Sequence, residues 1–197
     1  MSHYYTNEPT KDVPGQFQFE LNHRQYTLAT NAGVFSKDKL DEGTRILLKT
    51  VLEEGDGKGP VLDMGCGIGP VSKVMATEWK VPVTAIDVNE KAVQLARQNT
   101  GGLDVTCQVN DGLRDIDTQF ANILINPPIR TGKKTVYRLL EECAHHLNKE
   151  GSLWIVMRKQ HGAQSAVTYL ESLGLQVQRA ARSMGYWILK VTKPQED

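Results

Sequence analysis

The period of the hydrophobic pattern changes several times along the chain, and each change predicts a different kind of element. Apolar and polar residues alternate over 17–21 and 26–30, on either side of a polar turn, as in the strands of a β-hairpin. Over 40–52 the apolar residues recur at helical spacing, with Asp41 at the N-cap position and glycines after the last turn. We therefore expect residues 1–57 to form an N-terminal extension, a hairpin and a helix, packed on the same domain as the rest.

From residue 58 onward, apolar runs of strand length alternate with segments of helical period. Such alternation is typical of a parallel sheet covered by helices, and the last two runs, close together, predict an antiparallel edge hairpin. The expected strands are 60–64, 82–87, 105–109, 121–125, 152–157, 175–178 and 186–191, and the expected helices are 69–79, 89–99, 134–146 and 163–172. Residues 58–197 are thus predicted to form an α/β, Rossmann-like domain with a mostly parallel seven-stranded sheet.

Length and composition narrow the class of protein. At 197 residues the chain fits one α/β domain and is too short for two full catalytic domains. The N-terminus lacks a leader pattern and no run of about 18 apolar residues occurs, so we expect a soluble, cytoplasmic protein without membrane contact. Cys66, Cys107 and Cys143 are widely spaced and odd in number, which disfavours a disulfide framework or a zinc site, and we expect no metal.

Charge is balanced overall but not along the chain. The formal net charge is zero, which argues against a protein that coats nucleic acid by bulk electrostatics. Residues 129–197 nevertheless carry 11 Lys or Arg against 6 Asp or Glu. The cations after two of the predicted strands are Arg130, Lys133, Lys134, Arg138, Arg158, Lys159 and His161. Two interpretations remain open for them: a solvated basic face, or a rim that contacts the phosphates of an RNA.

A glycine-rich turn follows the first predicted strand of the parallel sheet. In the segment 61–70, VLDMGCGIGP, alternate positions hold Asp63, Gly65, Gly67 and Gly69. Glycine lets the backbone approach a ligand that any Cβ would push away, and such turns cradle nucleosides. The third glycine comes one residue earlier than in the dinucleotide pattern Gly-x-Gly-x-x-Gly, which disfavours a nicotinamide cofactor. A purely structural turn is the alternative.

An acidic residue ends the next predicted strand. Asp87 follows the apolar run 83–86 and lies about 20 residues beyond the glycines. At this place in a nucleotide-binding α/β fold, a carboxylate accepts hydrogen bonds from the ribose hydroxyls. The spacing therefore supports a nucleoside site at the carboxyl edge of the sheet.

The strand predicted at 121–125 is followed by Asn126-Pro127-Pro128. Because prolines lack N–H donors, this segment presents acceptors: the side-chain oxygen of Asn126 and the carbonyl oxygen of Pro127. An exocyclic amino group is a poor nucleophile because its lone pair is delocalised, and two acceptors on its hydrogens favour the pyramidal form that can attack. We interpret the three residues as a catalytic group for transfer to nitrogen that needs positioning and no strong base. A plain strand-terminating turn is the alternative.

Three stretches, 31–45, 61–70 and 126–130, carry a closer likeness. They resemble class I S-adenosylmethionine-dependent methyltransferases, and among these the small-subunit ribosomal RNA guanine-N2 methyltransferase family. Residues 3–6 and 185–188 look like those of its short, single-domain bacterial branch. The resemblance implies S-adenosylmethionine as cofactor and methyl transfer to an exocyclic amino nitrogen, guanine N2 in 16S ribosomal RNA. It also implies RNA, or the small ribosomal subunit, as the partner.

The same resemblance assigns roles to individual residues. Asp111-Gly112 is where such enzymes place a contact to the adenine amino group, and a turn former or helix cap is the alternative for Asp111. A loop with Phe35 and Ser36 is expected to fold over the pocket, with Thr44 near the methionine end of the cofactor. The implied cofactor-binding residues are Thr44, Asp63, Gly65, Cys66, Gly67, Gly69, Asp87, Val88, Asp111, Gly112 and Asn126.

The substrate side departs from the family pattern at Ile129. Many members have Phe after the two prolines, where a ring stacks on the target base, and Ile129 has no ring. We expect Phe35 to supply the stacking. The implied substrate-binding set is Phe35, Ser36, Ile129, Arg130, Lys133 and Lys134. Well-studied members also carry a second, RNA-binding domain for which this chain has no room, and a homodimer is one way to replace it.

Three other functions remain open at this point. A protein glutamine methyltransferase also uses Asn-Pro-Pro, but normally with Tyr next, so Ile129 speaks against it. A small-molecule N-methyltransferase is compatible with the neutral charge. A non-catalytic cofactor-binding or RNA-binding module is disfavoured, because a decayed enzyme would have lost some of the glycines, Asp87 or Asn126.

Overall fold

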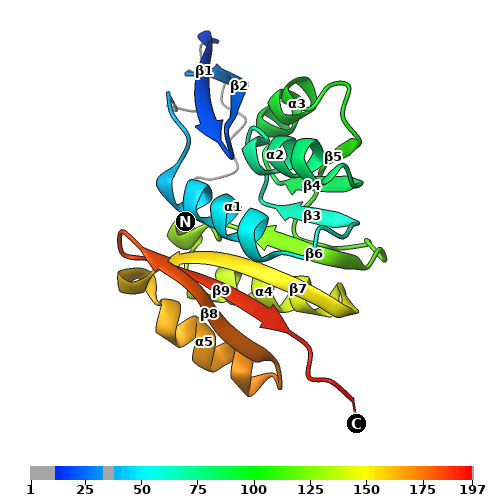
Figure 1. The fold of residues 1–197 in the computed structure, drawn as a ribbon, viewed down its shortest axis with the longest axis vertical. Coiled ribbons are helices and arrows are strands. Elements are labelled where there is room, and N and C mark those ends of the chain that lie inside the picture. Colours follow the sequence, from blue (N-terminus) through cyan, green and yellow to red (C-terminus); the bar gives the residue numbers. More distant parts are fainter. Residues whose placement is uncertain (1–11, 33–37, 197) are drawn as a thin grey trace.

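The main sheet has seven strands in the order β5-β4-β3-β6-β7-β9-β8. The structure, a computed structural model, describes residues 12–32 and 38–196 (Figure 1). Strands β3 to β7 are parallel, and β9 and β8 run antiparallel at one edge. The strands are β3 Val61–Met64, β4 Val83–Asp87, β5 Val105–Val109, β6 Phe120–Ile125, β7 Leu147–Arg158, β8 Gln176–Ser183 and β9 Tyr186–Thr192. The predicted α/β fold with an antiparallel edge hairpin is confirmed.

Helices cover both faces of this sheet, and a separate hairpin of β1 and β2 lies at one end (Figure 1). The hairpin strands are β1 Pro14–Leu21 and β2 Arg24–Asn31, and the helices are α1 Glu42–Glu54, α2 Pro70–Trp79, α3 Glu90–Asn99, α4 Lys133–His145 and α5 Ala163–Ser172. Short 3₁₀ turns follow β6 at Ile129–Thr131 and β7 at Lys159–His161. These two turns lie beside the site described below.

Alternate residues of the central strands point to opposite cores. Leu124 and Trp154 pack with α1, α2 and the hairpin, whereas their neighbours Ile123 and Leu153 pack with α4 and α5. All four side chains are fully buried. A strand covered on both faces has few polar positions, which is why these strands appear in the sequence as short continuous apolar runs.

The edge strand β8 is longer than its sequence predicted. It covers Gln176–Ser183, whereas the pattern indicated only 175–178. Most of its side chains are exposed or half-buried, and its register shifts between Arg179 and Ala181. An outer strand needs one neighbour to satisfy its backbone and little apolar surface, so the hydrophobic pattern stops before the strand does.

The N-terminal elements share a core with the sheet. Phe19 and Leu28 of the hairpin and Leu47 of α1 belong to the same buried cluster as Val74 of α2. The division of the chain at residue 57 stays a prediction.

The order of the strands reverses beside β3, which lies between β4 and β6. Connections leave β4 and β6 in opposite directions, so the carboxyl ends of β3 and its two neighbours border a crevice, the usual ligand site of open α/β sheets. Among the helices in the described part of the chain, none is long and apolar enough to cross a membrane. In those same residues, no cluster of three or more His, Cys, Asp or Glu side chains has a geometry suited to a metal ion.

Candidate functional site

The glycine turn after β3 has a backbone that other residues adopt only under strain. Gly65 has φ of 74° and Gly67 has φ of 53°, both in the left-handed region. The N–H groups of Gly65 and Cys66 both donate to the carbonyl oxygen of Ile86 at 2.8 Å. A Cβ added at Gly65 or Gly67 would project into open space. The turn is therefore tied to β4 on one side and leaves its other side free for a ligand.

Gly69 has a different role in the same turn. It is the N-cap of α2 with φ of 96°, and a Cβ on it would come within 3.2 Å of the Cα of Ala96 in α3. This glycine lets two helices pack closely, and its predicted part in cofactor binding stays a prediction.

Asp63 is a buried carboxyl whose partners are all on α2. Its Oδ2 accepts from the backbone N of Ser72 at 3.0 Å and from the Ser72 hydroxyl at 2.7 Å. Burial raises the pKa of Asp63 to about 7, which the two hydrogen bonds from Ser72 only partly offset. Asp63 thus joins the end of β3 to the first turn of α2, directly below the crevice.

Asp87 supports the glycine turn from the end of β4. Its Oδ2 accepts from the N–H of Gly67 at 2.9 Å, and its Oδ1 accepts from the N–H of Asn89, also at 2.9 Å. Each carboxylate oxygen has further acceptor capacity, so a ribose hydroxyl remains a compatible partner. The sequence did not predict that Asp87 would also hold the turn in place.

Asp111 and its neighbours lie farther along the same edge. The Oδ1 of Asp111 accepts from Arg138 at 2.8 Å. Gly112 is buried beside Glu142, and Val88 is 45% exposed. None of these predicted cofactor residues lines the cavity described next, and their roles stay predictions.

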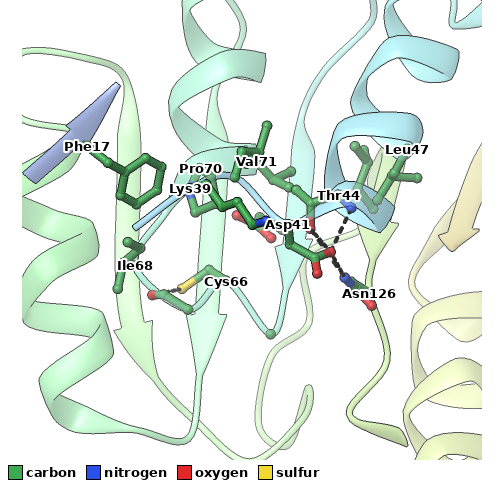
Figure 2. Close-up of a pocket in the computed structure, with 15 residues that line it drawn as sticks. Phe17, Lys39, Asp41, Thr44, Leu47, Cys66, Ile68, Pro70, Val71 and Asn126 are labelled. Atoms are coloured by element: carbon green, nitrogen blue, oxygen red, sulfur yellow. Dashed lines mark hydrogen bonds between the residues drawn. The ribbon is translucent and has the colours of Figure 1, made fainter. Parts of the chain in front are cut away.

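A cavity opens over the glycine turn, and four parts of the chain line it (Figure 2). The hairpin contributes Phe17, and β6 and the segment after it contribute Leu124 and Asn126. The remaining lining residues come from 39–47 and 63–71, and they are Lys39, Leu40, Asp41, Thr44, Leu47, Asp63, Gly65, Cys66, Gly67, Ile68, Pro70 and Val71. The lining residues that were not predicted to bind a ligand are Phe17, Lys39, Leu40, Asp41, Leu47, Ile68, Pro70, Val71 and Leu124, and nothing in a hairpin, a linker, a helix cap or an apolar position marks them as such.

Asn126 is held in one orientation by the first turn of α1. Its amide nitrogen donates to Asp41 Oδ2 and to Thr44 Oγ1, each at 3.2 Å. Asp41 Oδ2 also accepts from the backbone N of Thr44 at 2.9 Å, and Figure 2 shows Asp41 between the other two side chains. A carboxylate only accepts, so the nitrogen of the Asn126 amide faces Asp41 and its Oδ1 points away. Thr44 lies beside Asn126 and lines the cavity, and its expected place near the methionine end of the cofactor stays a prediction.

A second cavity also borders Asn126. Its walls come from the N-cap of α1, the Asn-Pro-Pro segment, the facing ends of β7 and β9 and the two 3₁₀ turns. The lining residues are Asp41, Asn126, Pro127, Pro128, Ile129, Arg130, Thr131, Val156, Met157, Arg158, His161 and Tyr186. Asp41 and Asn126 line both cavities. These two side chains therefore form the boundary between the two cavities.

The predicted substrate residues are distributed unevenly around this second cavity. Ile129 and Arg130 line it, whereas Lys133 lines an adjoining pocket between α4 and α5, with its Nζ 5.2 Å from the centre of the Tyr137 ring. Lys134, next to it on α4, is exposed and lines neither of these pockets. Phe35 and Ser36 lie outside the described residues.

The sequence is similar to methyltransferases along most of its length. Residues 25–190 match the family described as methyltransferase small domain. The chain is 39% identical to the uncharacterized protein YbxB of Bacillus subtilis, over 97% of this chain and 98% of that one. It is 33% identical to ribosomal RNA small subunit methyltransferase C of Aeromonas hydrophila, over 72% of this chain but only 43% of that protein. The chain thus spans less than half the length of that larger relative.

Solved structures share the fold at lower identity. The T. thermophilus 16S rRNA N2 G1207 methyltransferase (RsmC), in complex with AdoMet and guanosine, has a TM-score of 0.80 at 19% identity, covering 95% of this chain and 52% of that one. A ribosomal protein L11 methylase from Lactobacillus delbrueckii has a TM-score of 0.67 at 19% identity, covering 82% and 88%. With the family match over residues 25–190, the chain belongs to the methyltransferase small domain family and is a methyltransferase of the S-adenosylmethionine-dependent class.

Proposed function

We propose that this protein transfers the methyl group of S-adenosylmethionine to N2 of guanine in 16S ribosomal RNA. One observation carries the proposal: the fixed amide of Asn126 lies between a cavity over the glycine turn and a second, more cationic cavity. The similarity to ribosomal RNA small subunit methyltransferase C supports ribosomal RNA as the substrate, and the fold shared with the 16S rRNA N2 G1207 methyltransferase supports N2 of guanine as the target.

The first cavity fits the cofactor. The turn at Gly65 and Gly67 would hold its nucleoside part, because a Cβ at either glycine would occupy that space. Asp87 has acceptor capacity left for the ribose hydroxyls, and Thr44 borders the cavity at the Asn126 end. When bound, S-adenosylmethionine supplies a methyl group on a positively charged sulfur.

The acceptors that would activate the amino group are available. The Oδ1 of Asn126 is free to accept, since its amide nitrogen is turned toward Asp41. The carbonyl oxygen of Pro127 already accepts from the N–H of Ile129 at 2.9 Å and keeps a second lone pair. Hydrogen bonds from a guanine amino group to these two oxygens would favour its pyramidal form and aim its lone pair toward the first cavity.

The transfer would be direct, from the cofactor to the substrate nitrogen. Burial raises the pKa of the thiols of Cys66, Cys107 and Cys143, so none of them forms a thiolate that could carry the methyl group first. Asn126 Oδ1 and the Pro127 carbonyl would hold the amino nitrogen in line with the methyl group that S-adenosylmethionine would supply. The nitrogen–carbon bond would form as the sulfur–carbon bond breaks, and the methylated nitrogen would then lose a proton to water. Positioning and electrostatics do this work without a strong base.

The test is methyl transfer from labelled S-adenosylmethionine to 16S RNA, small ribosomal subunits and total protein, with products identified by nucleoside mass spectrometry. N2-methylguanosine formed by the wild type and absent with Asn126→Ala is the expected result. Label found only in protein would replace the proposal with glutamine methylation. Cofactor binding without any labelled macromolecule would leave a small-molecule substrate or a non-catalytic module, and the proposal would be wrong.

A further inference from the structure

If a base binds in the cavity beside Asn126, it requires a flat group to stack on. The Asn-Pro-Pro segment and Ile129 after it contain no aromatic ring or guanidinium. Ile129 follows the prolines, is half-buried and packs against the α4 side of the core. Sequence-specific binding of an unpaired base depends on stacking against an aromatic ring or a guanidinium plane. Four side chains that line the cavity carry such groups, Arg130, Arg158, His161 and Tyr186, and of these Arg158 and Tyr186 lie one over the other.

Arg158 and Tyr186 form one unit because of strand pairing. They are directly opposite each other in the antiparallel ladder of β7 and β9, and the Lys159 N–H donates to the Gly185 carbonyl at 2.9 Å just beyond them. The guanidinium carbon of Arg158 lies 4.4 Å from the centre of the Tyr186 ring, within the range of a cation–π contact. We call this pair the Arg158–Tyr186 stack.

The ring of Tyr186 is also supported by α1. A Cβ added to Gly43 would come within 2.8 Å of Tyr186 Cε1, so the missing side chain of Gly43 makes room for the ring. Gly43 lies between Asp41, which lines both cavities, and Thr44, which holds the Asn126 amide. The helix turn that orients Asn126 is therefore the one that fixes the back of the stack.

Arg158 has no competing ionic partner. Within residues 12–32 and 38–196 it takes part in no salt bridge, although it is half-buried and its cavity also holds Arg130 and His161. A guanidinium is weakly hydrated and stacks on flat π-systems, so one face can rest on Tyr186 while the other meets a base.

We propose that the Arg158–Tyr186 stack is the surface on which the target base rests, in place of the aromatic residue missing at position 129. This inference rests on the proposed function and names the residues that bind its substrate. Arg158 is the substrate-binding group, and Tyr186 is a positioning residue that holds the planar guanidinium in place.

The experiment compares Arg158→Lys, Tyr186→Leu and Tyr186→Phe in the whole protein with the RNA that the wild type methylates and with guanosine as a phosphate-free probe. Arg158→Lys keeps the positive charge and removes the planar guanidinium. Tyr186→Phe keeps the aromatic ring and removes only the hydroxyl, whereas Tyr186→Leu removes the ring. The matched control is Arg179→Lys, since Arg179 lies 4.7 Å over the Trp187 ring in the same hairpin and lines no part of this cavity.

We expect Arg158→Lys and Tyr186→Leu to weaken guanosine binding, measured by saturation-transfer NMR, and to raise the KM for RNA about tenfold or more. Tyr186→Phe and Arg179→Lys should behave like the wild type. The affinity for S-adenosylhomocysteine, which does not need the stack, should be the same in all four variants.

Two outcomes would overturn the inference while leaving the proposed function intact. If Arg158→Lys binds guanosine and methylates guanine with the wild-type KM, Arg158 acts as a point charge and not as a stacking surface. If Tyr186→Phe is as impaired as Tyr186→Leu, the ring does not act by stacking. Failure of the proposed function looks different: the wild type itself would then form no N2-methylguanosine, and the inference would fall with it.

Discussion

The two cavities that meet at Asn126 are built in different ways. The proposed cofactor side is centred on backbone, a glycine turn with left-handed φ values tied to β4 through Ile86 and Asp87, and side chains from the hairpin, α1 and β6 surround that turn. The other side consists of side chains from segments far apart in the sequence, among them Arg130, Arg158 and Tyr186. A site for an invariant cofactor can be made from a short rigid motif. A site for a variable substrate is made from side chains that change while the fold stays the same.

Removing the amide shared by both sides should have the largest effect. We expect Asn126→Ala to lower kcat by roughly 100-fold or more, because an acceptor aimed at the reacting nitrogen is lost from a prearranged position. The affinity for S-adenosylmethionine, measured by calorimetry, should change little, since the glycine turn and Asp87 are intact. Undiminished turnover in this variant would refute the mechanism.

The backbone side is tested with one matched pair of glycines. Gly65→Ala should weaken cofactor binding by 10-fold or more and lower the free energy of unfolding by about 1–2 kcal/mol, because alanine resists the left-handed region. Gly57 has φ of 73°, nearly the same as the 74° of Gly65, and also faces open space, but it lies outside the cavity. Gly57→Ala should therefore lose similar stability and keep the cofactor affinity. Equal affinities in the two variants would remove Gly65 from the site.

The shared wall is tested at Asp41. Asp41→Ser keeps a good N-cap for α1 but shortens the side chain, so the acceptor that orients the Asn126 amide is withdrawn. We expect kcat to fall up to about tenfold, the value of one hydrogen bond, with an unchanged melting temperature. A drop in melting temperature that accounts for the lost activity would mean that Asp41 serves only the helix.

The cationic side is tested with two neighbouring lysines. Lys133 borders a pocket next to the substrate cavity and Lys134 does not, although both are exposed at the start of α4. Lys133→Gln should weaken RNA binding a few-fold and reduce its salt slope by about 1, while Lys134→Gln serves as the control. Identical slopes for both variants and the wild type would favour a merely solvated basic face.

The smallest expected effect is on the pH dependence of the free energy of unfolding, through the buried carboxyl of Asp63. The folded-state pKa of Asp63 is raised to about 7, above its unfolded value of about 4, so the folded protein binds this proton more tightly. The stability contributed by Asp63 is therefore complete below about pH 4 and is lost as the pH rises through 7. Asp63→Asn retains an acceptor for Ser72 and should flatten that part of the profile in urea denaturation. An unchanged profile would mean that Asp63 titrates normally.

Local patterns were enough for most of the fold. The runs at 61–64, 83–86 and 121–125 could be recognised as strands because burial on both faces leaves them almost without polar residues. Edge strand β8 was recognised only in part, because an exposed strand carries little hydrophobic signal. The predicted end of β7 was also too early: the apolar run stops at 157, whereas the strand includes the polar Arg158.

The glycine turn and Asn126 could be identified in the sequence because each motif is continuous and its residue types suit the chemistry predicted for it. Asp41 could be identified only as a helix cap, since its contact with Asn126 joins positions 85 residues apart. The Arg158–Tyr186 stack and the shape of the second cavity depend on strand register and on the space left by Gly43. Contacts of that kind arise from chain packing, and no short stretch of sequence contains them.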